Sequence, residues 1–213
     1  MHVRDLSDSA DPNAENCVNV TLYKRCNIRS AWLACSDITP STCVISLPFQ
    51  REIEFNTTKG YLTLLEESKI ILMGNYSIVT AISHSKSSFI SLYSTDESKY
   101  SSLKIANLAV HGFGGPTIDG GMMSIIGGCA LEMINVNISN SSGHLGGALY
   151  ISSTSANMIN ITDCTVTYST AVNGGAIYLN SNVNNFFMSN SKIMRGDATS
   201  NGYVSSLYFL SYY

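Results

Sequence analysis

The alternation of apolar and polar residues in the second half of the chain repeats with a fixed period. An eight-residue pattern, apolar-x-apolar-x-Asn/Asp-x-x-apolar, begins at Leu103, Leu131, Ile159 and Phe186, so that successive copies start 28, 28 and 27 apart. Apolar residues at every second position are typical of a β-strand, whose successive side chains point to opposite faces. Each copy therefore predicts two short strands joined by a bend.

The bend is marked by the polar residue at the centre of the pattern, which is Asn107, Asn135, Asp163 or Asn190. Asn and Asp tolerate the left-handed backbone conformation, which turns a chain sharply between two strands. We expect these four side chains to stack as a structural ladder, in which amides hydrogen-bond from one copy to the next.

A second motif has the same period. Gly146-Gly147-Ala148-Leu149 and Gly174-Gly175-Ala176-Ile177 are also 28 apart, and Gly202-Tyr203 begins a degenerate third copy. Because glycine adopts conformations closed to other residues, Gly-Gly predicts a sharper corner before a third strand. Three short strands and three corners in each repeat make one turn of a right-handed parallel β-helix. A β-sandwich is the main alternative, but it would show hairpin signals and no such register.

The sequence therefore predicts an all-β fold, a single-stranded parallel solenoid of about six or seven turns with a short capping helix. Stacked turns place residues 28 apart over one another. Leu131, Ile159 and Phe186 are expected to stack inside the coil. Lys104 and Glu132 share an outward position in adjacent turns, where they predict a cross-strand ion pair.

The capping helix is expected near the N-terminus, because the first turn of a solenoid exposes unpaired backbone. It covers residues 27–36, with Asn27 as its N-cap. Its apolar face consists of Ile28, Ala31, Trp32 and Cys35. Trp32 is interpreted as core filler at the mouth of the coil, and a first strand follows at 43–48.

Three regions are expected along the chain. These are a polar tail at residues 1–16, a cysteine-rich cap at 17–48 that holds the helix and the first strand, and β-helix turns at 49–213. The tail lacks the apolar core of a secretory signal peptide. The aromatic stretch at 206–213 predicts truncation at the C-terminal end, because a complete domain rarely exposes an apolar end.

Four of the six cysteines lie close together in the cap, and these disulfide candidates are Cys17, Cys26, Cys35 and Cys43. An even number in a small cap predicts two disulfides in an oxidising compartment, with three possible connectivities. Their spacings lack the Cys-x-x-Cys or histidine pattern of a zinc site, so no metal site is predicted. Cys164 falls in an inward column and is expected to be a buried free thiol.

Composition excludes several classes of partner. Charged residues make up 13% of the chain and the net charge is −3, whereas about 25% is typical of soluble domains. Such a chain has no basic surface for nucleic acid. It also contains no run of about 18 apolar residues, so no transmembrane segment is predicted.

Candidate catalytic groups are sparse. Glycoside hydrolysis uses paired carboxylates, and calcium prefers six or more oxygen ligands. After residue 100 the acidic side chains are Asp119, Glu132, Asp163 and Asp197, and none forms a pair in one column. The best constellation is Asp163 with Lys192 and Arg195 one turn later. His144 would lie in the intervening corner. We therefore predict no catalytic residues and no cofactor in this chain.

Tyr150 and Tyr178 are the candidate binding residues. They lie one period apart, each between apolar neighbours, so they are expected to point outward as a stacked pair. Aromatic ladders on a flat parallel sheet can receive sugar rings or a protein partner. The same pair could equally shield the strand backbone, and both interpretations stay open.

These motifs resemble two known groups of β-helix proteins. The Gly-Gly-Ala-Ile/Leu corners, with Phe187-Met188-Ser189-Asn190 as a match to Phe-x-x-Asn, resemble the repeats of polymorphic outer membrane protein adhesins. Cys26-Asn27-Ile28-Arg29-Ser30-Ala31 is similar to the Cys-Ser-Leu-Arg-Glu-Ala element that opens many pectin-lyase-like β-helix proteins. In those proteins an apolar strand ending in proline often follows, as at 44–48.

The resemblance covers most of residues 17–202 and implies an extracellular or cell-surface protein. It favours a non-enzymatic, adhesin-like or surface-display module that binds glycans or proteins. The alternative is a carbohydrate-active β-helix enzyme, similar to a polysaccharide lyase or a glycoside hydrolase, whose catalytic residues lie outside this chain. Fold transfers more safely than activity in such a comparison.

Overall fold

The computed structural model describes residues 26–36, 42–82, 87–94, 100–152, 158–180 and 185–199, together with the backbone of 206–209. Its elements in chain order are the helix α2 (Ile28–Ser36) and the strands β1 (Thr42–Ser46), β2 (Glu52–Asn56), β3 (Leu62–Leu64), β4 (Lys69–Ile82), β5 (Ile90–Tyr93), β6 (Ser101–His111), β7 (Met123–Ile126), β8 (Cys129–Ser139), β9 (Ser142–Leu145), β10 (Leu149–Ser152), β11 (Ile159–Thr162), β12 (Thr165–Asn173), β13 (Ile177–Leu179), β14 (Phe186–Ser189), β15 (Ser191–Ala198) and β16 (Ser206–Phe209). A 3₁₀ turn, η1 (Thr57–Lys59), lies between β2 and β3.

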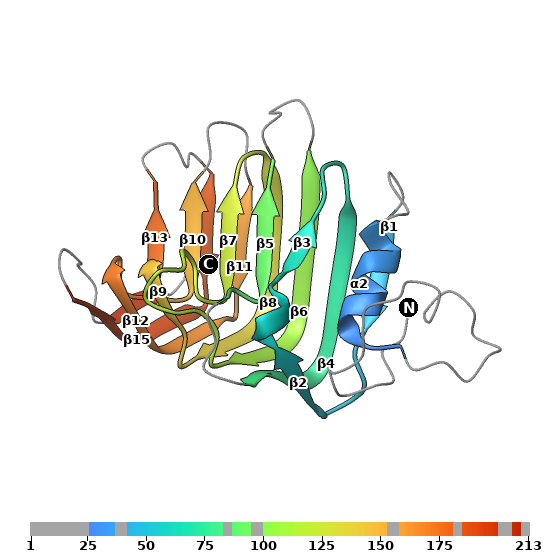
Figure 1. The fold of residues 1–213 in the computed structure, drawn as a ribbon. Coiled ribbons are helices and arrows are strands. Elements are labelled where there is room, and N and C mark those ends of the chain that lie inside the picture. The colour runs from blue at the N-terminus through green and yellow to red at the C-terminus, as the bar shows by residue number, and fades with distance from the viewer. Residues whose placement is uncertain are drawn as a thin grey trace.

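The strands stack into two sheets, as Figure 1 shows. The larger sheet has eleven strands, with the main path β1-β4-β6-β8-β12-β15-β16, and the smaller has five in the order β13-β10-β7-β5-β3. The chain alternates between the two sheets and returns to each one strand further on. The fold is therefore a parallel β-solenoid of about five turns with a short N-terminal helix. The all-β solenoid and its helix are confirmed.

The solenoid has fewer turns than the six or seven expected, for two physical reasons. An early turn is longer than the repeat, because Lys69 pairs with Ser102 instead of with a residue one period away. At the other end, β16 pairs antiparallel with β15. This strand therefore ends the parallel progression of the larger sheet instead of starting another turn.

The later turns stack in the expected register. Ile159 lies beside Leu131 on one side and beside Phe186 on the other. Lys104 lies beside Glu132, and their Nζ and Oε2 atoms are 2.8 Å apart. Both the stacking of residues one period apart and the predicted ion pair are confirmed.

The polar corner of each turn is left-handed, as predicted. Asn107, Asn135, Asp163 and Asn190 have φ angles of 55°, 53°, 55° and 47°. Asn135 Nδ2 donates a hydrogen bond of 2.8 Å to Asn107 Oδ1. The ladder of amides between these two turns is thus confirmed.

A second row of left-handed residues, which sequence reasoning missed, occupies the next corner. Gly112, Asn140, Tyr168 and Arg195 have φ angles of 79°, 51°, 53° and 55°. Tyrosine and arginine rarely adopt this conformation, so residue type gave no signal for the corner. Stacking against neighbouring turns holds these residues there.

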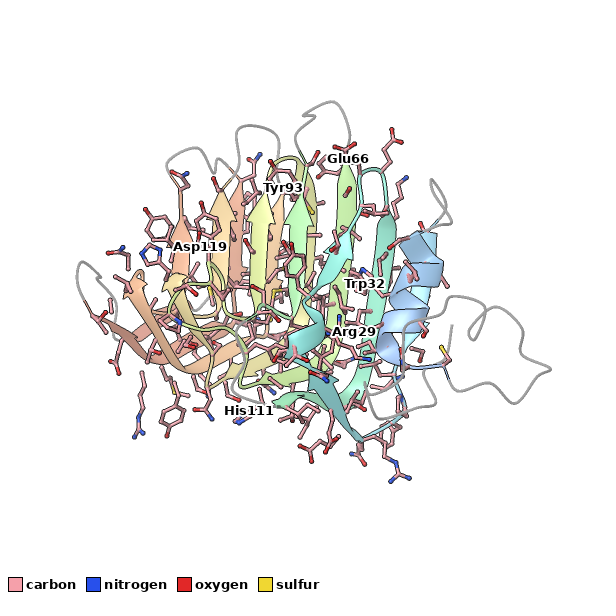
Figure 2. All side chains as sticks on the ribbon, viewed as in Figure 1. Arg29, Trp32, Glu66, Tyr93, His111 and Asp119 are labelled. Atoms are coloured by element: carbon pink, nitrogen blue, oxygen red, sulfur yellow. A yellow bond between two sulfur atoms is a disulfide. The ribbon has the colours of Figure 1, made fainter. Side chains whose placement is uncertain are left out.

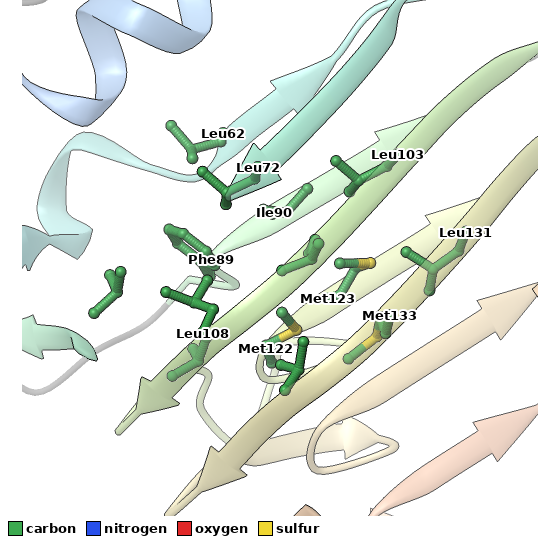
Figure 3. Close-up of a cluster of buried hydrophobic side chains, with 14 of the residues drawn as sticks. Leu62, Leu72, Phe89, Ile90, Leu103, Leu108, Met122, Met123, Leu131 and Met133 are labelled. Atoms are coloured by element: carbon green, nitrogen blue, oxygen red, sulfur yellow. The ribbon is translucent and has the colours of Figure 1, made fainter. Parts of the chain in front are cut away.

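Inward side chains from both sheets fill the coil (Figure 3). Leu62, Leu72, Leu103, Leu131 and Met133 are each at most 3% exposed. Full burial of such a side chain contributes about 1.5–3 kcal/mol. A continuous apolar column therefore runs the length of the described turns.

Three phenylalanines form an aromatic stack within this core. The ring centroids of Phe55, Phe89 and Phe113 are 5.2–5.5 Å apart, within the range of favourable aromatic pairs. Their separations along the chain do not match the period of the repeat. The period therefore could not reveal this stack.

Helix α2 closes the N-terminal end of the core. Asn27 Oδ1 accepts a hydrogen bond of 2.8 Å from Ser30 N, which confirms the predicted N-cap. Trp32 is 3% exposed, and its Nε1 donates to the Thr63 carbonyl at 2.7 Å. Because both β1 and β3 contact the helix, it is buried around most of its circumference, with Leu33 43% exposed. The prediction of a single buried face was therefore too narrow.

The side chain of Arg29, in the first turn of α2, reaches Phe55 in the aromatic stack. Its guanidinium carbon is 4.0 Å from the ring centroid of Phe55. Its Nη2 donates to the carbonyl oxygens of Asn56 and Gly60, at 2.8 and 2.7 Å. Arg29 thus joins the cap to the first turns, a role that sequence reasoning did not assign.

A disulfide between Cys35 and Cys43, with Cα atoms 5.5 Å apart, ties α2 to β1. Cys26 is also disulfide-bonded, while Cys17, the tail 1–16 and residues 202–203 lie outside the described residues. Under the prediction of two disulfides among the four cap cysteines, Cys17 and Cys26 remain as the other expected pair. Cys129 and Cys164 are buried thiols outside any disulfide, as predicted for Cys164.

In the described part of the chain, no helix combines the length and apolarity that crossing a membrane requires.

Candidate functional site

The paired tyrosines lie on the outer surface of the five-stranded sheet. Tyr150 on β10 is in register with Tyr178 on β13, and their ring centroids are 5.9 Å apart with an interplanar angle of 33°. Leu149 and Ile151, on either side of Tyr150, are fully buried. Strand alternation therefore turns the Tyr150 ring outward, the register places the Tyr178 ring beside it, and both tyrosines are half-buried.

The tyrosine column continues across the sheet as a row of hydroxyl side chains. Tyr150 pairs with Ser124, which pairs with Ser91, which pairs with Thr63. These five residues are in register on successive strands, and Ser124 in the middle of the row is 9% exposed. With neighbouring strands about 4.8 Å apart, the row is about 19 Å long.

A cleft of about 860 Å³ opens beside this row. The residues that line it are mostly hydroxyl-bearing: Thr57, Thr58, Gly60, Tyr61, Ser87, Ser88, Ser91, Thr117, Ile118, Asp119 and Ser124. One wall comes from η1 and the residues after it, and the other from the loop that precedes β7. Because Ser91 and Ser124 belong to both the row and the cleft, the two features are continuous.

Asp119 is the acidic side chain of the cleft. Its Oδ1 lies 3.4 Å from His144 Nδ1 and accepts a hydrogen bond of 3.2 Å from Leu145 N. Both side chains remain partly open to solvent, at 39% for Asp119 and 49% for His144. The loop is thereby tied to β9 in the next turn, and Asp119 is also among the residues that line the cleft.

A glycine pair fixes the position of Asp119. Gly120 has a φ of 69°, and a Cβ atom there would lie 1.9 Å from the Met123 carbonyl oxygen. At Gly121 a Cβ atom would lie 2.1 Å from the Gly147 carbonyl oxygen. Only glycine fits such close backbone packing, so this corner holds Asp119 at the edge of the sheet (Figure 2).

The constellation around Asp163 does not assemble as a site. Asp163 stands at the first left-handed corner. Arg195 stands at the second, where its Nη1 donates to the Tyr168 hydroxyl at 2.7 Å. His144 contacts Asp119 instead. Two separate corners hold these groups apart.

Metal ligation finds no support in the described residues, where no three His, Cys, Asp or Glu side chains converge in a way that could hold an ion. Among the described residues, the cleft lining includes a single carboxylate and no lysine or arginine. Such a surface can donate and accept neutral hydrogen bonds and can stack flat groups on the tyrosine pair. It does not provide the two carboxylates of ordinary glycoside hydrolysis.

Sequence reasoning found the tyrosines but missed the cleft. Serine and threonine are abundant throughout the chain, so the cleft hydroxyls carry no distinctive pattern. Asp119 could have been singled out by the Gly-Gly corner that follows it. Its contact with His144 depends on stacking between turns and is not visible from spacing.

No family model, curated protein or solved structure matches the chain. Functional assignment therefore depends on the residues of the site themselves.

Proposed function

We propose that the protein binds a neutral glycan along the outer surface of its five-stranded sheet and acts as an adhesin-like or surface-display module. The observation that carries this proposal is that the tyrosine pair and the cleft form one continuous surface. Through Ser124, the Tyr150–Tyr178 platform joins the hydroxyl-lined cleft. Aromatic faces and neutral hydrogen-bonding groups are therefore available to one extended ligand.

The chemistry of the row fits a sugar chain. The two rings lie side by side with a tilt of 33° and offer apolar faces on which sugar rings can stack. The neighbouring serines and threonines can exchange hydrogen bonds with sugar hydroxyls, each contributing about 0.5–1.5 kcal/mol. Many weak contacts of this kind suit multivalent adhesion.

A neutral ligand is favoured over an acidic one. Among the described residues that line the cleft, Asp119 is the charged side chain and none is a lysine or arginine, so a uronate or sulfate group would approach a carboxylate there. Asp119 suits a role as hydrogen-bond acceptor for a vicinal diol, because charge-assisted hydrogen bonds are about twice as strong as neutral ones.

We further propose an extracellular location and a relationship to polymorphic outer membrane protein repeats and pectin-lyase-like proteins. The Cys35–Cys43 disulfide supports an oxidising compartment. The Gly-Gly corners and the parallel solenoid support the relationship. So does the buried Arg29, which occupies the arginine position of the Cys-Ser-Leu-Arg-Glu-Ala-like element.

A glycan array probed with the full chain tests the proposal, followed by calorimetry on any neutral oligosaccharide that binds. Tyr150→Ala and Tyr178→Ala are each expected to weaken that binding about tenfold, because a stacking partner is lost. Tyr150→Phe is expected to retain it. The matched control is Tyr76→Ala, which changes an exposed tyrosine outside the five-stranded sheet. Equal losses for Tyr76→Ala, or no binding to any neutral glycan, would refute the proposal.

The enzymatic alternative is tested separately. The protein is incubated with acidic and neutral polysaccharides, with and without calcium. We expect no release of reducing or unsaturated ends, because the described part of the cleft lining holds a single carboxylate. Release that disappears in Asp119→Asn would establish the enzyme and overturn the adhesin-like assignment.

A further inference from the structure

The outer face of the larger sheet carries an unbroken column of paired residues. From strand to strand the column runs through Val44, Ile71, Lys104, Glu132, Asn160 and Phe187. It lies on β1, β4, β6, β8, β11 and β14, away from the five-stranded sheet. We call the outward surface of these strands the ion-pair face.

The ion-pair face is symmetric at its centre and at its two ends, while its second and fifth positions hold Ile71 and Asn160. Lys104 and Glu132 occupy the two middle positions of the column, 2.8 Å apart and each more than a third exposed. Val44 and Phe187 occupy the two ends, 44% and 60% exposed. Opposite charges thus lie at the centre and exposed apolar side chains at both extremities.

We infer that this face binds a second copy of the chain, with the two solenoids antiparallel. A two-fold axis along the strand direction, passing between the two central residues, brings Lys104 opposite Glu132 of the second copy and Glu132 opposite its Lys104. The same operation brings Val44 opposite Phe187 of the second copy. An isologous contact requires this self-complementarity.

One flanking column is compatible with the same axis. Ser102 pairs with Ala130 within one chain, so the axis sets small side chains against small ones. Lys69 is brought opposite Met158 of the second copy, which is 58% exposed. Both residues line a groove of about 450 Å³ beside the ion pair, and this groove has space for the long methionine side chain.

The size of the face sets the strength of the contact. Six strands about 4.8 Å apart and about five residues long cover roughly 500 Å² per copy. Two copies then bury about 1,000 Å², the lower limit for a specific interface. The dimer is therefore expected to be weak and reversible.

Sedimentation velocity of charge variants of the whole chain tests the inference. Lys104→Glu places two acidic groups opposite each other across the axis, and Glu132→Lys places two basic groups there. Each variant alone is expected to lose at least tenfold in dimer affinity. An equimolar mixture of the two regains the wild-type affinity, because every cross-axis pair is then of opposite sign. Mixing the two variants does not restore the ion pair within either chain. Recovery of association in the mixture therefore shows that these residues meet across the dimer interface.

A second variant and a control complete the experiment. Phe187→Ser alters an exposed end of the column and is expected to weaken the dimer without charge repulsion. Glu52→Lys, on β2 and outside the face, leaves the affinity unchanged. Wild-type protein that stays monomeric up to millimolar concentration, or a mixture that fails to associate, overturns the inference. Since the five-stranded sheet stays open in this dimer, glycan binding and dimerisation are tested independently.

Discussion

Arg29 is buried together with its charge, and its partners show why this is tolerated. Two carbonyl oxygens and the face of Phe55 surround the guanidinium group. Buried polar groups are costly unless hydrogen-bonded, and a cation over an aromatic face is stabilised. Its surroundings come from residues about thirty positions later in the chain, so its role could not be predicted from its own segment.

Arg29→Ala is expected to destabilise the fold by about 3 kcal/mol, because two carbonyl oxygens lose their donor. The stability of Arg29→Lys is expected to lie between those of the wild-type protein and Arg29→Ala, since a lysine cannot reproduce the planar contact. Urea denaturation followed by circular dichroism measures the change. Arg51→Ala, at an exposed position, is the control and is expected to shift stability by less than about 0.5 kcal/mol. Similar losses for both variants would contradict this account.

The two buried thiols predict a defined response to alkaline pH. Burial raises the pKa of Cys129 from 9.0 to about 12, and burial is also the main cause that raises the pKa of Cys164 to about 11. In the unfolded chain both ionise near their ordinary value. The stability they contribute is therefore complete below about pH 9 and is lost as the pH rises toward 11–12.

Urea midpoints between about pH 7 and about pH 11 check this response. Wild-type protein is expected to lose more stability over that interval than the double variant Cys129→Ala/Cys164→Ala, which lacks both ionisations. Native protein at neutral pH should also resist iodoacetamide until urea is added. Parallel pH curves for the two proteins would show that other groups cause the alkaline loss.

At the scale of elements, the first corner of each turn was predictable and the second was not. Asn or Asp recurs at the first corner in every copy, and its left-handed preference is a property of the residue. At the second corner Tyr168 and Arg195 adopt the same conformation because neighbouring turns impose it. The cleft could not be predicted either, since η1 and the loop before β7 do not repeat.

Two substitutions at Asn135 separate the contribution of the left-handed backbone conformation from that of the side-chain hydrogen bond. Asn135→Gly retains the left-handed conformation but loses the amide bond to Asn107. Asn135→Ala loses the bond and also strains the backbone by about 1 kcal/mol. Alanine is thus expected to destabilise the protein more than glycine in chemical denaturation. Equal losses for the two variants would show that the amide bond to Asn107, and not the backbone conformation, decides this position.

At the scale of the whole molecule, the period alone was enough to predict the solenoid, because stacking in register is a property of every turn at once. The number of turns was overestimated where that period fails, in the early turn between Lys69 and Ser102 and at the antiparallel β16. The site was predicted only in part for the same reason. Its tyrosines repeat, whereas its cleft does not.

The cap gives a prediction about covalent structure. Peptide mapping of non-reduced protein is expected to recover Cys17 joined to Cys26 and Cys35 joined to Cys43. Reduction is expected to lower stability by about 2–3 kcal/mol, because the bond closing the loop from Cys35 to Cys43 constrains the unfolded chain. Recovery of Cys17 joined to Cys43 would exclude this arrangement.

The row of amides at the first corner also bears on how such a chain can change its length over generations. Duplication of one whole repeat, for example residues 131–158, keeps every side chain on the same face of its sheet, inward or outward. It also adds a matching amide to the row. The molecule grows by about 4.8 Å, one strand spacing. Gain or loss of an odd number of residues within a strand would instead expose its apolar side chains to solvent. Lineages of this protein are therefore expected to differ by complete repeats.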